Sequence, residues 1–282
     1  MKTVLILEGG AMRGLYTAGV LDVLLDHPEI RFDAVAGVSA GALFGINYKS
    51  RQRDRALRYN VKYCDDEGYF SMRSYVKTGD LMNREFCFDK LPNELDPFDY
   101  DAYRENPLAF YAVVTNLLTG QAEYPLLDDL KRAEQMEYLR ASGSLPFLSR
   151  PVMIDHVPYL DGGVADSIPV RHFLDAGFDR AVVVLTRPKG YRKSGLIAGA
   201  HLKYPRYPFF ADALMNRNLV YNRTCDEVET LENEGTIFVL RPSRDVGVKR
   251  TESDRNKLQE LYEVGTSDSE SNLPAILDYL NS

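Results

Sequence analysis

Apolar and polar residues along the first fifty positions predict two strands, each followed by a helix. Residues 4–7 form a continuous apolar run, which is typical of a strand buried on both faces of a parallel sheet. Residues 15–25 carry apolar side chains at helical spacing, mostly on one face, and Pro28 ends that helix. Residues 32–38 predict a second strand and residues 40–49 a second helix. This order is the beginning of a parallel sheet with right-handed crossovers.

Later segments predict further strands and helices of the same kind. Strands are expected at residues 108–118, 122–126, 152–154, 159–160, 181–185 and 237–240. Helices are expected at residues 51–66, 128–141, 170–176, 212–234, 253–261 and 273–280. The second of these strands pairs back on the first, and the third and fourth form a hairpin with His156 at its tip. Together the elements predict an α/β fold, a three-layer α/β/α sandwich around a mostly parallel sheet.

Residues 67–103 interrupt this regular pattern. They contain Pro92, Pro97 and many aromatic side chains without a clear period. We expect an excursion of short helices outside the sheet, which forms either a cap over a site or a packing insert without substrate contact. No repeat or linker is evident, so we predict one domain over residues 1–282. Within this domain, a core of about residues 1–186 is followed by a C-terminal extension, residues 187–282, which packs on the core.

Composition and charge narrow the function classes. The chain has 45% hydrophobic and 27% charged residues, as in an ordinary globular protein. Its net charge of −7 argues against nucleic acid as the main partner. The N-terminal apolar run is too short for a signal peptide, and no stretch approaches the roughly 20 apolar residues of a membrane span, so we expect a cytoplasmic protein. Cys64, Cys87 and Cys225 are widely spaced and predict neither a disulfide framework nor a zinc site.

The segment Gly37-Val38-Ser39-Ala40-Gly41 lies where the second predicted strand meets the second helix. A Gly-x-Ser-x-Gly sequence in this context is typical of a nucleophile elbow, a turn so tight that only small residues fit beside the serine. The turn lifts the serine hydroxyl out of the sheet, and the N-terminus of the following helix stabilises developing negative charge. The motif alone is weak evidence for a nucleophilic serine, so the assignment depends on the neighbouring segments.

A glycine-rich loop follows the first predicted strand. Gly9, Gly10 and Ala11 precede Arg13 and Gly14, and their consecutive N–H groups can form a concavity for an anion. A nucleotide phosphate is one candidate, but neither the dinucleotide-binding fingerprint nor the Walker pattern is present. Beside a serine elbow, an oxyanion hole is the better interpretation.

A nucleophilic serine needs a base within hydrogen-bond reach. The four histidines are His27, His156, His172 and His201, and none follows a late strand as in a conventional α/β-hydrolase. We interpret each as a surface or structural residue. Asp161, followed by Gly162 and Gly163, is the other candidate. Alone, this tripeptide indicates a turn, but burial beside an apolar pocket would raise the pKa of the carboxyl to a value useful for a base.

These three segments, in this order, resemble the motifs of the patatin-like phospholipase family. The family's Asp-Gly-Gly-Gly-x-Arg/Lys-Gly loop corresponds to residues 8–14, its Gly-x-Ser-x-Gly serine to Ser39 and its Asp-Gly-Gly/Ala aspartate to Asp161. The family's Ala-Ser-x-x-x-Pro block occurs at residues 141–146, and Ser-Ile-Pro at 167–169 follows the aspartate as in many members. The resemblance covers residues 4 to 185, whereas the last hundred residues are less typical.

Two positions depart from the family pattern. Glu8 stands where the family has aspartate, and we expect little effect if that residue is structural. Ala11 stands in place of the third glycine. If that position requires a positive φ, alanine costs on the order of 1 kcal/mol, but its N–H remains to bind an oxyanion.

The resemblance implies a patatin-like fold and the hydrolysis of lipid carboxylic esters, as in a phospholipase A, a lysophospholipase or an esterase. Ser39 is the expected nucleophile, Asp161 the general base, and the N–H groups of Gly9, Gly10 and Ala11 the oxyanion hole. Water then releases the fatty acid from an acyl-enzyme. No metal or other cofactor is implied. The residues expected to support these motifs are Arg13, Gly14, Gly37, Gly41, Gly162 and Gly163.

Residues 188–217 are the one cationic segment of this acidic chain, and aromatic residues interleave with the lysines and arginines. This combination suits an anionic lipid surface, so we interpret the segment as a candidate for peripheral contact with the inner membrane surface. A mobile lid over the acyl pocket and a solvated loop are the alternatives.

Two other functions stay open at this point. An acyltransferase or thioesterase on the same scaffold would form the same acyl-enzyme and differ only in its acceptor or donor. A non-catalytic lipid- or nucleotide-binding protein is the second alternative, but binding alone would require neither Ser39 nor Asp161.

Overall fold

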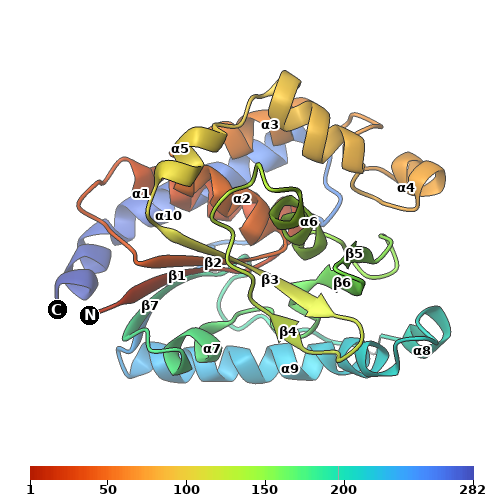
Figure 1. Cartoon of the computed structure of the whole chain (residues 1–282). Helices are drawn as coiled ribbons and strands as arrows, with labels where there is room; N and C mark the ends of the chain where they lie inside the picture. Colours follow the sequence, from red (N-terminus) through yellow and green to blue (C-terminus); the bar gives the residue numbers. More distant parts are fainter. Residues whose placement is uncertain (196) are drawn as a thin grey trace.

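The computed structural model describes residues 1–195 and 197–282. Leu196, which belongs to the predicted lipid-binding segment, lies outside the described residues. A central sheet lies between two layers of helices, and both chain termini lie at the same end of the molecule (Figure 1). The predicted three-layer α/β/α sandwich is therefore confirmed.

Within residues 1–195 and 197–282, the sheet has eight strands. They are β1 (Thr3–Leu7), β2 (Ala34–Val38), β3 (Ala109–Asn116), β4 (Ala122–Glu123), β5 (Val152–Ile154), β6 (Val157–Asp161), β7 (Arg180–Val184) and β8 (Ile237–Leu240). Their order is β5-β6-β3-β2-β1-β7-β8, with β4 paired to β3. Strands β3, β2, β1, β7 and β8 pair in parallel, whereas β4, β5 and β6 pair antiparallel. The carboxyl ends of β1, β2 and β7 are therefore neighbours, which is where open α/β sheets build their sites.

Helices cover both faces of the sheet (Figure 1). One face carries α1 (Leu15–Leu25), α2 (Ala40–Lys49), α3 (Arg55–Tyr63), α5 (Tyr100–Glu105), α6 (Ala133–Ser142) and α10 (Arg255–Asn281). The other face carries α7 (Val170–Asp175), α8 (Ala200–Lys203) and α9 (Pro208–Asn233). The α4 helix (Met72–Thr78) projects at the end of the molecule opposite the termini. Short elements are the 3₁₀ turns η1 (Ala11–Gly14) and η3 (Gly162–Val164) and the π-helix η2 (Phe86–Leu95).

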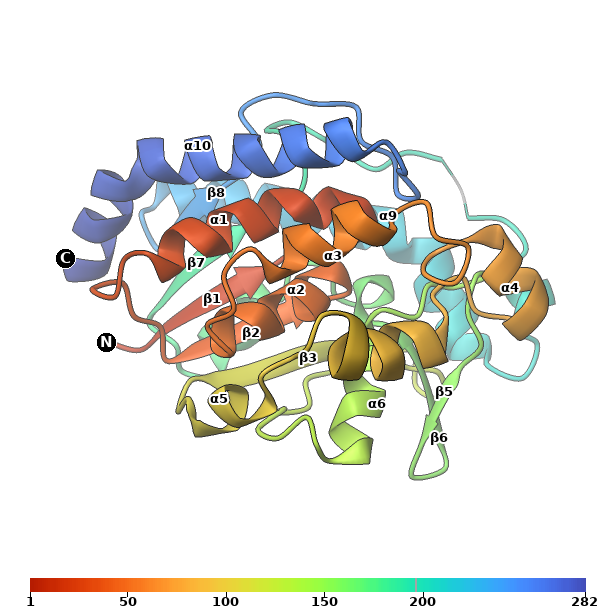
Figure 2. The same ribbon diagram turned by 90° about the horizontal axis from the view of Figure 1, so that it is seen from above.

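The α10 helix lies along α1 (Figure 2). It covers the face of α1 that the amphipathic pattern predicts to be exposed. Residues 15 to 24 of α1 are consequently all buried. The two helices approach closely because each contributes a glycine. A Cβ atom at Gly19 would lie 2.2 Å from the carbonyl oxygen of Tyr262, and one at Gly265 would lie 2.2 Å from that of Tyr16. The prediction of one apolar face on α1 underestimated its burial, since the covering helix comes from the far end of the chain.

Two helix predictions were wrong in extent. The expected pair of closing helices is one helix, α10, which continues through Gly265 and contains Pro274. Its weak helix formers are retained because packing on α1 outweighs their propensity. The helix expected from residue 128 begins at Ala133, because Asp129 forms a turn in which its carbonyl accepts a hydrogen bond from the N–H of Arg132 at 3.1 Å.

The 67–103 segment forms α4, η2 and α5, in agreement with the expected short helices. The hairpin of β5 and β6 has Asp155 and His156 at its tip, both with positive φ, 47° and 67°. Within the described residues, no helix is both long and apolar enough to cross a bilayer.

Candidate active site

Ser39 lies in the tight turn between β2 and α2, at the carboxyl end of a parallel strand. Its φ of 55° and ψ of −122° are rare for a residue with a side chain, and such strain is typical of functional turns. Glycine is needed beside it for space. A Cβ at Gly41 would lie 2.3 Å from the carbonyl oxygen of Leu7, and one at Gly37 would lie 2.5 Å from the Cα of Ala42.

Asp161, the last residue of β6, lies directly beside the serine. The Ser39 hydroxyl donates to Oδ2 of Asp161 at 2.6 Å, and the N–H of Gly163 donates to Oδ1 at 2.7 Å. The exposed fractions are 8% for Ser39 and 2% for Asp161. Gly162 permits this approach, since a Cβ there would lie 2.2 Å from the carbonyl oxygen of Val113. Residues 122 positions apart in the chain thus form a buried, hydrogen-bonded pair.

The Ala141–Pro146 block holds both members of this pair through the backbone. The N–H of Ser39 donates to the Ser142 hydroxyl at 2.9 Å, and the N–H of Asp161 donates to the carbonyl of Ser144 at 2.9 Å. In the sequence, the block is recognisable only as a match to a family pattern. Its hydrogen bond to the N–H of Ser39 was not predicted, because a side-chain acceptor for a distant N–H leaves no local sequence signal.

The glycine loop faces the same pocket. Gly9, Gly10 and Ala11 line it together with Ser39 and Asp161. Ala11 has a φ of 50°, so the position does require the left-handed region. In the described part of the chain, the N–H groups of Gly9, Gly10 and Ala11 have no hydrogen-bond acceptor. The loop therefore offers three backbone donors beside the serine.

The carboxylate of Glu8, which directly precedes this loop, connects it to two other segments by hydrogen bonds. Its Oε2 accepts hydrogen bonds from the N–H and hydroxyl of Thr186 at 2.7 and 3.1 Å, and its Oε1 accepts from the hydroxyl of Tyr221 at 2.8 Å. The carboxylate is 3% exposed and fully occupied by these donors. Glu8 thus joins β1 to the loop after β7 and to α9, which agrees with the structural function expected for this position. Gly14 follows the loop and packs on Phe44.

Burial raises the pKa of Asp161, and this effect exceeds the opposing effects of Arg217, the Ser39 hydroxyl, the Gly163 N–H and Lys193. A carboxyl group with a raised pKa is a stronger base than an ordinary aspartate. The guanidinium of Arg217 also donates through Nε to the carbonyl of Gly163, so it supports the turn that follows the aspartate.

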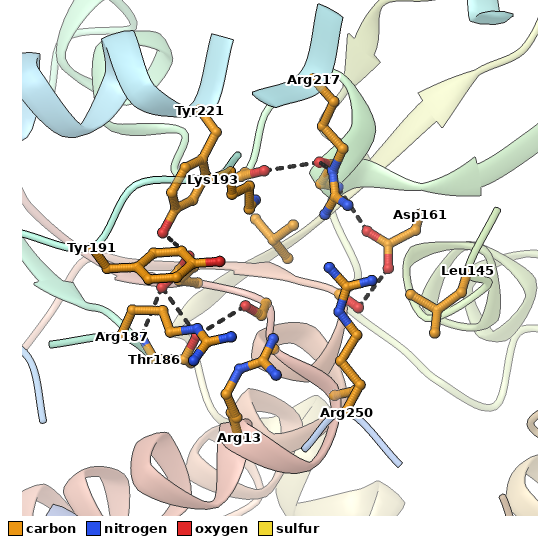
Figure 3. A pocket seen from close by; sticks show the side chains of 18 residues that line it. Arg13, Leu145, Asp161, Thr186, Arg187, Tyr191, Lys193, Arg217, Tyr221 and Arg250 are labelled. Carbon is orange, nitrogen blue, oxygen red and sulfur yellow. Dashed lines mark hydrogen bonds between the residues drawn. The ribbon is translucent and has the colours of Figure 1, made fainter. Parts of the chain in front are cut away.

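Five cationic side chains converge on the pocket from separate segments (Figure 3). They are Arg13 of η1, Arg187 and Lys193 of the loop after β7, Arg217 of α9 and Arg250 of the loop before α10. Lys193 and Arg217 belong to residues 188–217, the predicted candidate for lipid contact or a lid, and both line the pocket. Arg187 and Arg250 were not predicted as site residues, because neither lies near a recognisable motif.

The four histidines lie elsewhere. His172 stacks on Tyr124 with ring centroids 3.5 Å apart, His201 pairs with Asp212 at 2.9 Å, and His27 pairs with Glu29 at 3.0 Å. His156 is at the hairpin tip. No histidine lines the Ser39 pocket among the described residues, and over the same residues no cluster of metal-ligating side chains is found.

Fold and site together define an α/β protein with a serine elbow beside a buried aspartate and a glycine-rich loop. Residues 5–174 match the sequence model of a family described as patatin-like phospholipase. The chain belongs to the patatin-like phospholipase family. A second model, described as a domain of unknown function (DUF6363), matches residues 207–281.

The chain is also similar to individual proteins. It is 27% identical over 191 residues to YjjU of Escherichia coli (strain K12), described as uncharacterized, covering 66% of this chain and 52% of YjjU. It is 27% identical over 286 residues to lysophospholipase nte1 of Emericella nidulans, covering 93% of this chain and 17% of that protein. The chain thus spans about half of the first relative and a small part of the second. A crystal structure of VipD from Legionella pneumophila aligns with a TM-score of 0.48 at 12% identity, over 98% of this chain and 67% of VipD.

Proposed function

We propose that the protein hydrolyses a carboxylic ester of a lipid through a Ser39–Asp161 dyad. The observation that carries this proposal is the 2.6 Å hydrogen bond from the Ser39 hydroxyl to Asp161. Family membership and the similarity to a lysophospholipase support lipid esters as the substrate class.

In the proposed reaction, Ser39 Oγ attacks the ester carbonyl carbon while Asp161 accepts the hydroxyl proton. The carbonyl π electrons move to the oxygen, which the N–H groups of the Gly9–Ala11 loop stabilise. The tetrahedral intermediate then expels the alcohol, which takes the proton back from Asp161, and an acyl-enzyme remains. Water, deprotonated by Asp161, then attacks the acyl carbonyl carbon. As the bond from this carbon to Ser39 Oγ breaks, Asp161 returns the proton to Oγ, and the fatty acid is released. Each step uses the same two side chains and the same donors.

A second pocket, lined mainly by apolar side chains, lies between α2, α6 and the insert and is a candidate for the acyl chain. Its lining includes Leu43, Met82, Phe88 and Met136. Leu43 and Met82 both pack on Gly143, the neighbour of the Ser142 that accepts the Ser39 N–H bond. We infer that the insert helices cover the bound acyl chain, so the insert functions as a cap.

Covalent labelling by a fluorophosphonate tests the proposal. Wild type should be labelled at Ser39, Ser39→Ala should not be labelled, and Asp161→Asn should react at least a hundred-fold more slowly because the amide cannot accept the proton. The matched control is Ser167→Ala, which removes another hydroxyl of the same pocket and should keep its labelling. Equal hydrolysis of a short p-nitrophenyl ester by Ser39→Ala and wild type would refute the dyad. Product analysis with an alcohol acceptor separates hydrolysis from acyl transfer.

We further propose that the end of the molecule bearing α4 and α8 contacts the lipid surface. Exposed apolar side chains there are Met72 and Val76 of α4, Leu202 of α8 and Phe209 of α9. They flank a groove lined by residues of both helices and by Arg150, Lys203 and Arg206. Apolar residues beside cations suit an anionic bilayer. Lys193 faces the pocket and Arg192 pairs with Asp226 and Glu229, so these two cations are excluded from the proposed surface.

Vesicle co-sedimentation tests this surface. A Leu202→Ser, Phe209→Ser double variant should lose most of its binding to anionic vesicles while keeping its activity on a water-soluble ester. Arg192→Gln is the control and should bind as wild type does. Undiminished binding by the double variant would contradict the proposed surface.

A further inference from the structure

The Ser39 pocket has a charge opposite to that of the whole protein. The chain carries a net charge of −7, yet among the described residues five cations and only two carboxylates, Glu8 and Asp161, line this pocket. Hydrolysis of a neutral ester requires none of these cations in the reaction proposed above. Their concentration around the dyad therefore needs a separate explanation.

The two carboxylates compensate the five cations only in part, because two negative charges face five positive ones and their oxygens accept hydrogen bonds from neutral donors. Glu8 accepts from Thr186 and Tyr221, and Asp161 accepts from Ser39 and Gly163. Among the described residues, none of the five cations lies within ion-pair distance of a carboxylate, in contrast to neighbouring Arg192. These five cationic residues are Arg13, Arg187, Lys193, Arg217 and Arg250.

The surroundings of these five side chains do not fully compensate their positive charges. Nε of Arg13 is buried and has no hydrogen-bond partner in the described part of the chain. Nζ of Lys193 lies 3.4 Å from the ring centroid of Tyr221, and the Arg187 guanidinium lies 4.4 Å from that of Tyr191. Aromatic faces attract cations only modestly, so these contacts orient the side chains without replacing an anion.

The cations also repel one another. Burial, followed by the charges of Arg187 and Arg250, lowers the pKa of Arg13 to about 10. Burial, followed by the charge of Arg217, lowers the pKa of Lys193 to about 7. A bound anion would relieve both effects at once, since it would compensate the desolvated charges and screen them from each other.

We propose that this cluster binds a phosphomonoester headgroup, so that the substrates are acyl esters of glycerol phosphate rather than choline or ethanolamine lipids. The inference rests on the proposed hydrolysis at Ser39. In such a lipid the phosphate is only a few bonds from the ester carbonyl, so a phosphate next to Ser39 and the ester at Ser39 share one pocket. The site that binds the phosphate and the site that binds the ester are therefore parts of one pocket.

The number of cations favours a phosphomonoester over a zwitterionic headgroup. A phosphomonoester carries about −1.5 to −2 charge at pH 7, whereas a phosphodiester carries one negative charge. A choline or ethanolamine group would also bring an additional cation among five others, which the pocket disfavours. Guanidinium groups match phosphate oxygens with paired N–H donors, and four of the five cations are arginines.

The C-terminal segment contributes to this recognition. Arg217 and Arg250 both lie within residues 207–281, the part matched by the family of unknown function. Arg13 belongs to the patatin-like part, and Arg187 and Lys193 lie between the two. The structure thus assigns the segment of unknown function a binding task, because it contributes Arg217 and Arg250 to the headgroup site (Figure 3).

Binding to the full-length Ser39→Ala variant tests the inference without turnover. Calorimetry should compare monoacylglycerol phosphate with the matched monoacyl phosphocholine, both below their micelle concentrations, and with glycerol 3-phosphate alone. The phosphate lipid should bind at least ten-fold more tightly than the phosphocholine, and glycerol 3-phosphate should compete with it. With wild type, kcat/KM should favour the phosphate lipid by at least the same factor.

Charge-removing variants locate the site. Arg250→Gln and Arg187→Gln should each raise KM for the phosphate lipid about ten- to a hundred-fold, the usual effect of losing a charged hydrogen bond, and should lower kcat/KM on a neutral p-nitrophenyl ester by a much smaller factor. Lys189→Gln is the matched control, because this exposed lysine belongs to the same loop but does not line the pocket. It should leave both activities unchanged.

The outcomes separate the two proposals. Equal binding of the two lipids, or equal effects of Lys189→Gln and Arg250→Gln, would overturn the headgroup inference. Binding of glycerol 3-phosphate together with equal hydrolysis of the two lipids would also overturn it, because the ligand would then be a free phosphate. Preferential binding of the phosphate lipid by a protein that hydrolyses no ester would support the headgroup site and contradict the proposed hydrolysis.

Discussion

At the scale of single residues, the site depends on two positions with positive φ, Ser39 at 55° and Ala11 at 50°. In this conformation the Ser39 hydroxyl donates to Asp161, and Ala11 belongs to the loop that lines the same pocket. A left-handed alanine costs about 1–2 kcal/mol relative to glycine in the folded state, part of which is offset by the greater freedom of glycine in the unfolded chain.

Ala11→Gly should therefore raise the free energy of unfolding by about 1 kcal/mol. Urea unfolding of wild type and variant measures this change. Ala275→Gly, at an exposed position inside α10, is the control and should lower the free energy by about 1 kcal/mol through lost helix propensity. A loss of stability in both variants would show that Ala11 is not strained.

The pH dependence of substrate binding is expected to follow Lys193. Its pKa of about 7 results first from burial and then from Arg217 and Arg250, opposed by Glu8 and Asp161, and the ring of Tyr221 covers it. The ammonium is present below pH 7 and lost above it. KM for a phosphate-bearing lipid should therefore rise as the pH increases from 6 to 8.

Lys193→Arg keeps the positive charge over this range and should remove the rise in KM. A neutral ester should show no such rise with either protein. At lower pH, kcat should fall for both proteins as Asp161 becomes protonated, and burial places this loss at a higher pH than an ordinary aspartate would. A KM for the phosphate-bearing lipid that rises equally in wild type and Lys193→Arg would contradict the assignment to Lys193.

At the residue scale, the sequence predicts candidate site residues only where a short local motif contains them. Ser39, Asp161 and the glycine loop belong to short motifs whose spacing survives in the sequence, and the structure brings all three together. Arg187 and Arg250 are single cations in loops, and only the fold reveals that they face Ser39. Ser142 likewise became meaningful only through its bond to a residue 103 positions away.

At the scale of elements, the contact between α1 and α10 determines how the C-terminal helix is held. The bounds of α1 and α2 were predicted correctly because capping prolines, glycines and apolar spacing are local signals. The continuity of α10 was not predictable in this way, because its Gly265 and serine-rich middle would end an isolated helix. They remain helical since Gly265 and Ser269 are buried against other elements.

Gly19→Ala should destabilise the protein by about 1–3 kcal/mol, because the added methyl group would overlap the carbonyl of Tyr262. Helix propensity alone would give the opposite sign, since alanine is favoured over glycine by about 1 kcal/mol. Thermal unfolding measures the difference. Ser271→Ala, on an exposed part of α10, is the control and should change stability by less than about 0.5 kcal/mol. A stabilised Gly19→Ala would show that the helices are not in close contact.

A buried carboxyl group links α1, α3 and α10. Asp22 accepts hydrogen bonds from the Tyr262 hydroxyl at 3.0 Å and the N–H of Asp54 at 3.1 Å. Burial raises its pKa to about 6, against the opposing effects of these two bonds and of Arg53, while the carboxylate of Asp54 adds to the rise. Between pH 6 and the unfolded-state value of 3.8, the folded protein therefore holds a proton that the unfolded chain lacks.

Asp22 should consequently contribute stability that increases as the pH falls through 6. From pH 7 to pH 5, wild type should gain about 1 kcal/mol relative to Asp22→Asn, which cannot titrate. Urea unfolding of both proteins at the two pH values measures this difference. A constant difference would mean that the pKa of Asp22 is not raised.

At the scale of the whole molecule, the two matched regions share one site. Tyr221 of α9 bonds to Glu8 before the glycine loop, Arg217 bonds to Gly163 after the aspartate, and α10 packs along α1. The C-terminal segment is therefore continuous with the core in both packing and charge. The sequence of this segment is less typical of the family. This is expected if the segment recognises the lipid headgroup, whereas the core motifs carry out the reaction.

The most direct test of this account is the detection of an acyl-enzyme. Wild type mixed with a short-chain p-nitrophenyl ester and quenched early should gain the mass of one acyl group, located on the peptide that contains Ser39. Ser39→Ala should gain none and release p-nitrophenol only at the uncatalysed rate. An acyl group on another residue, or full activity without Ser39, would contradict the central claim that Ser39 is the nucleophile.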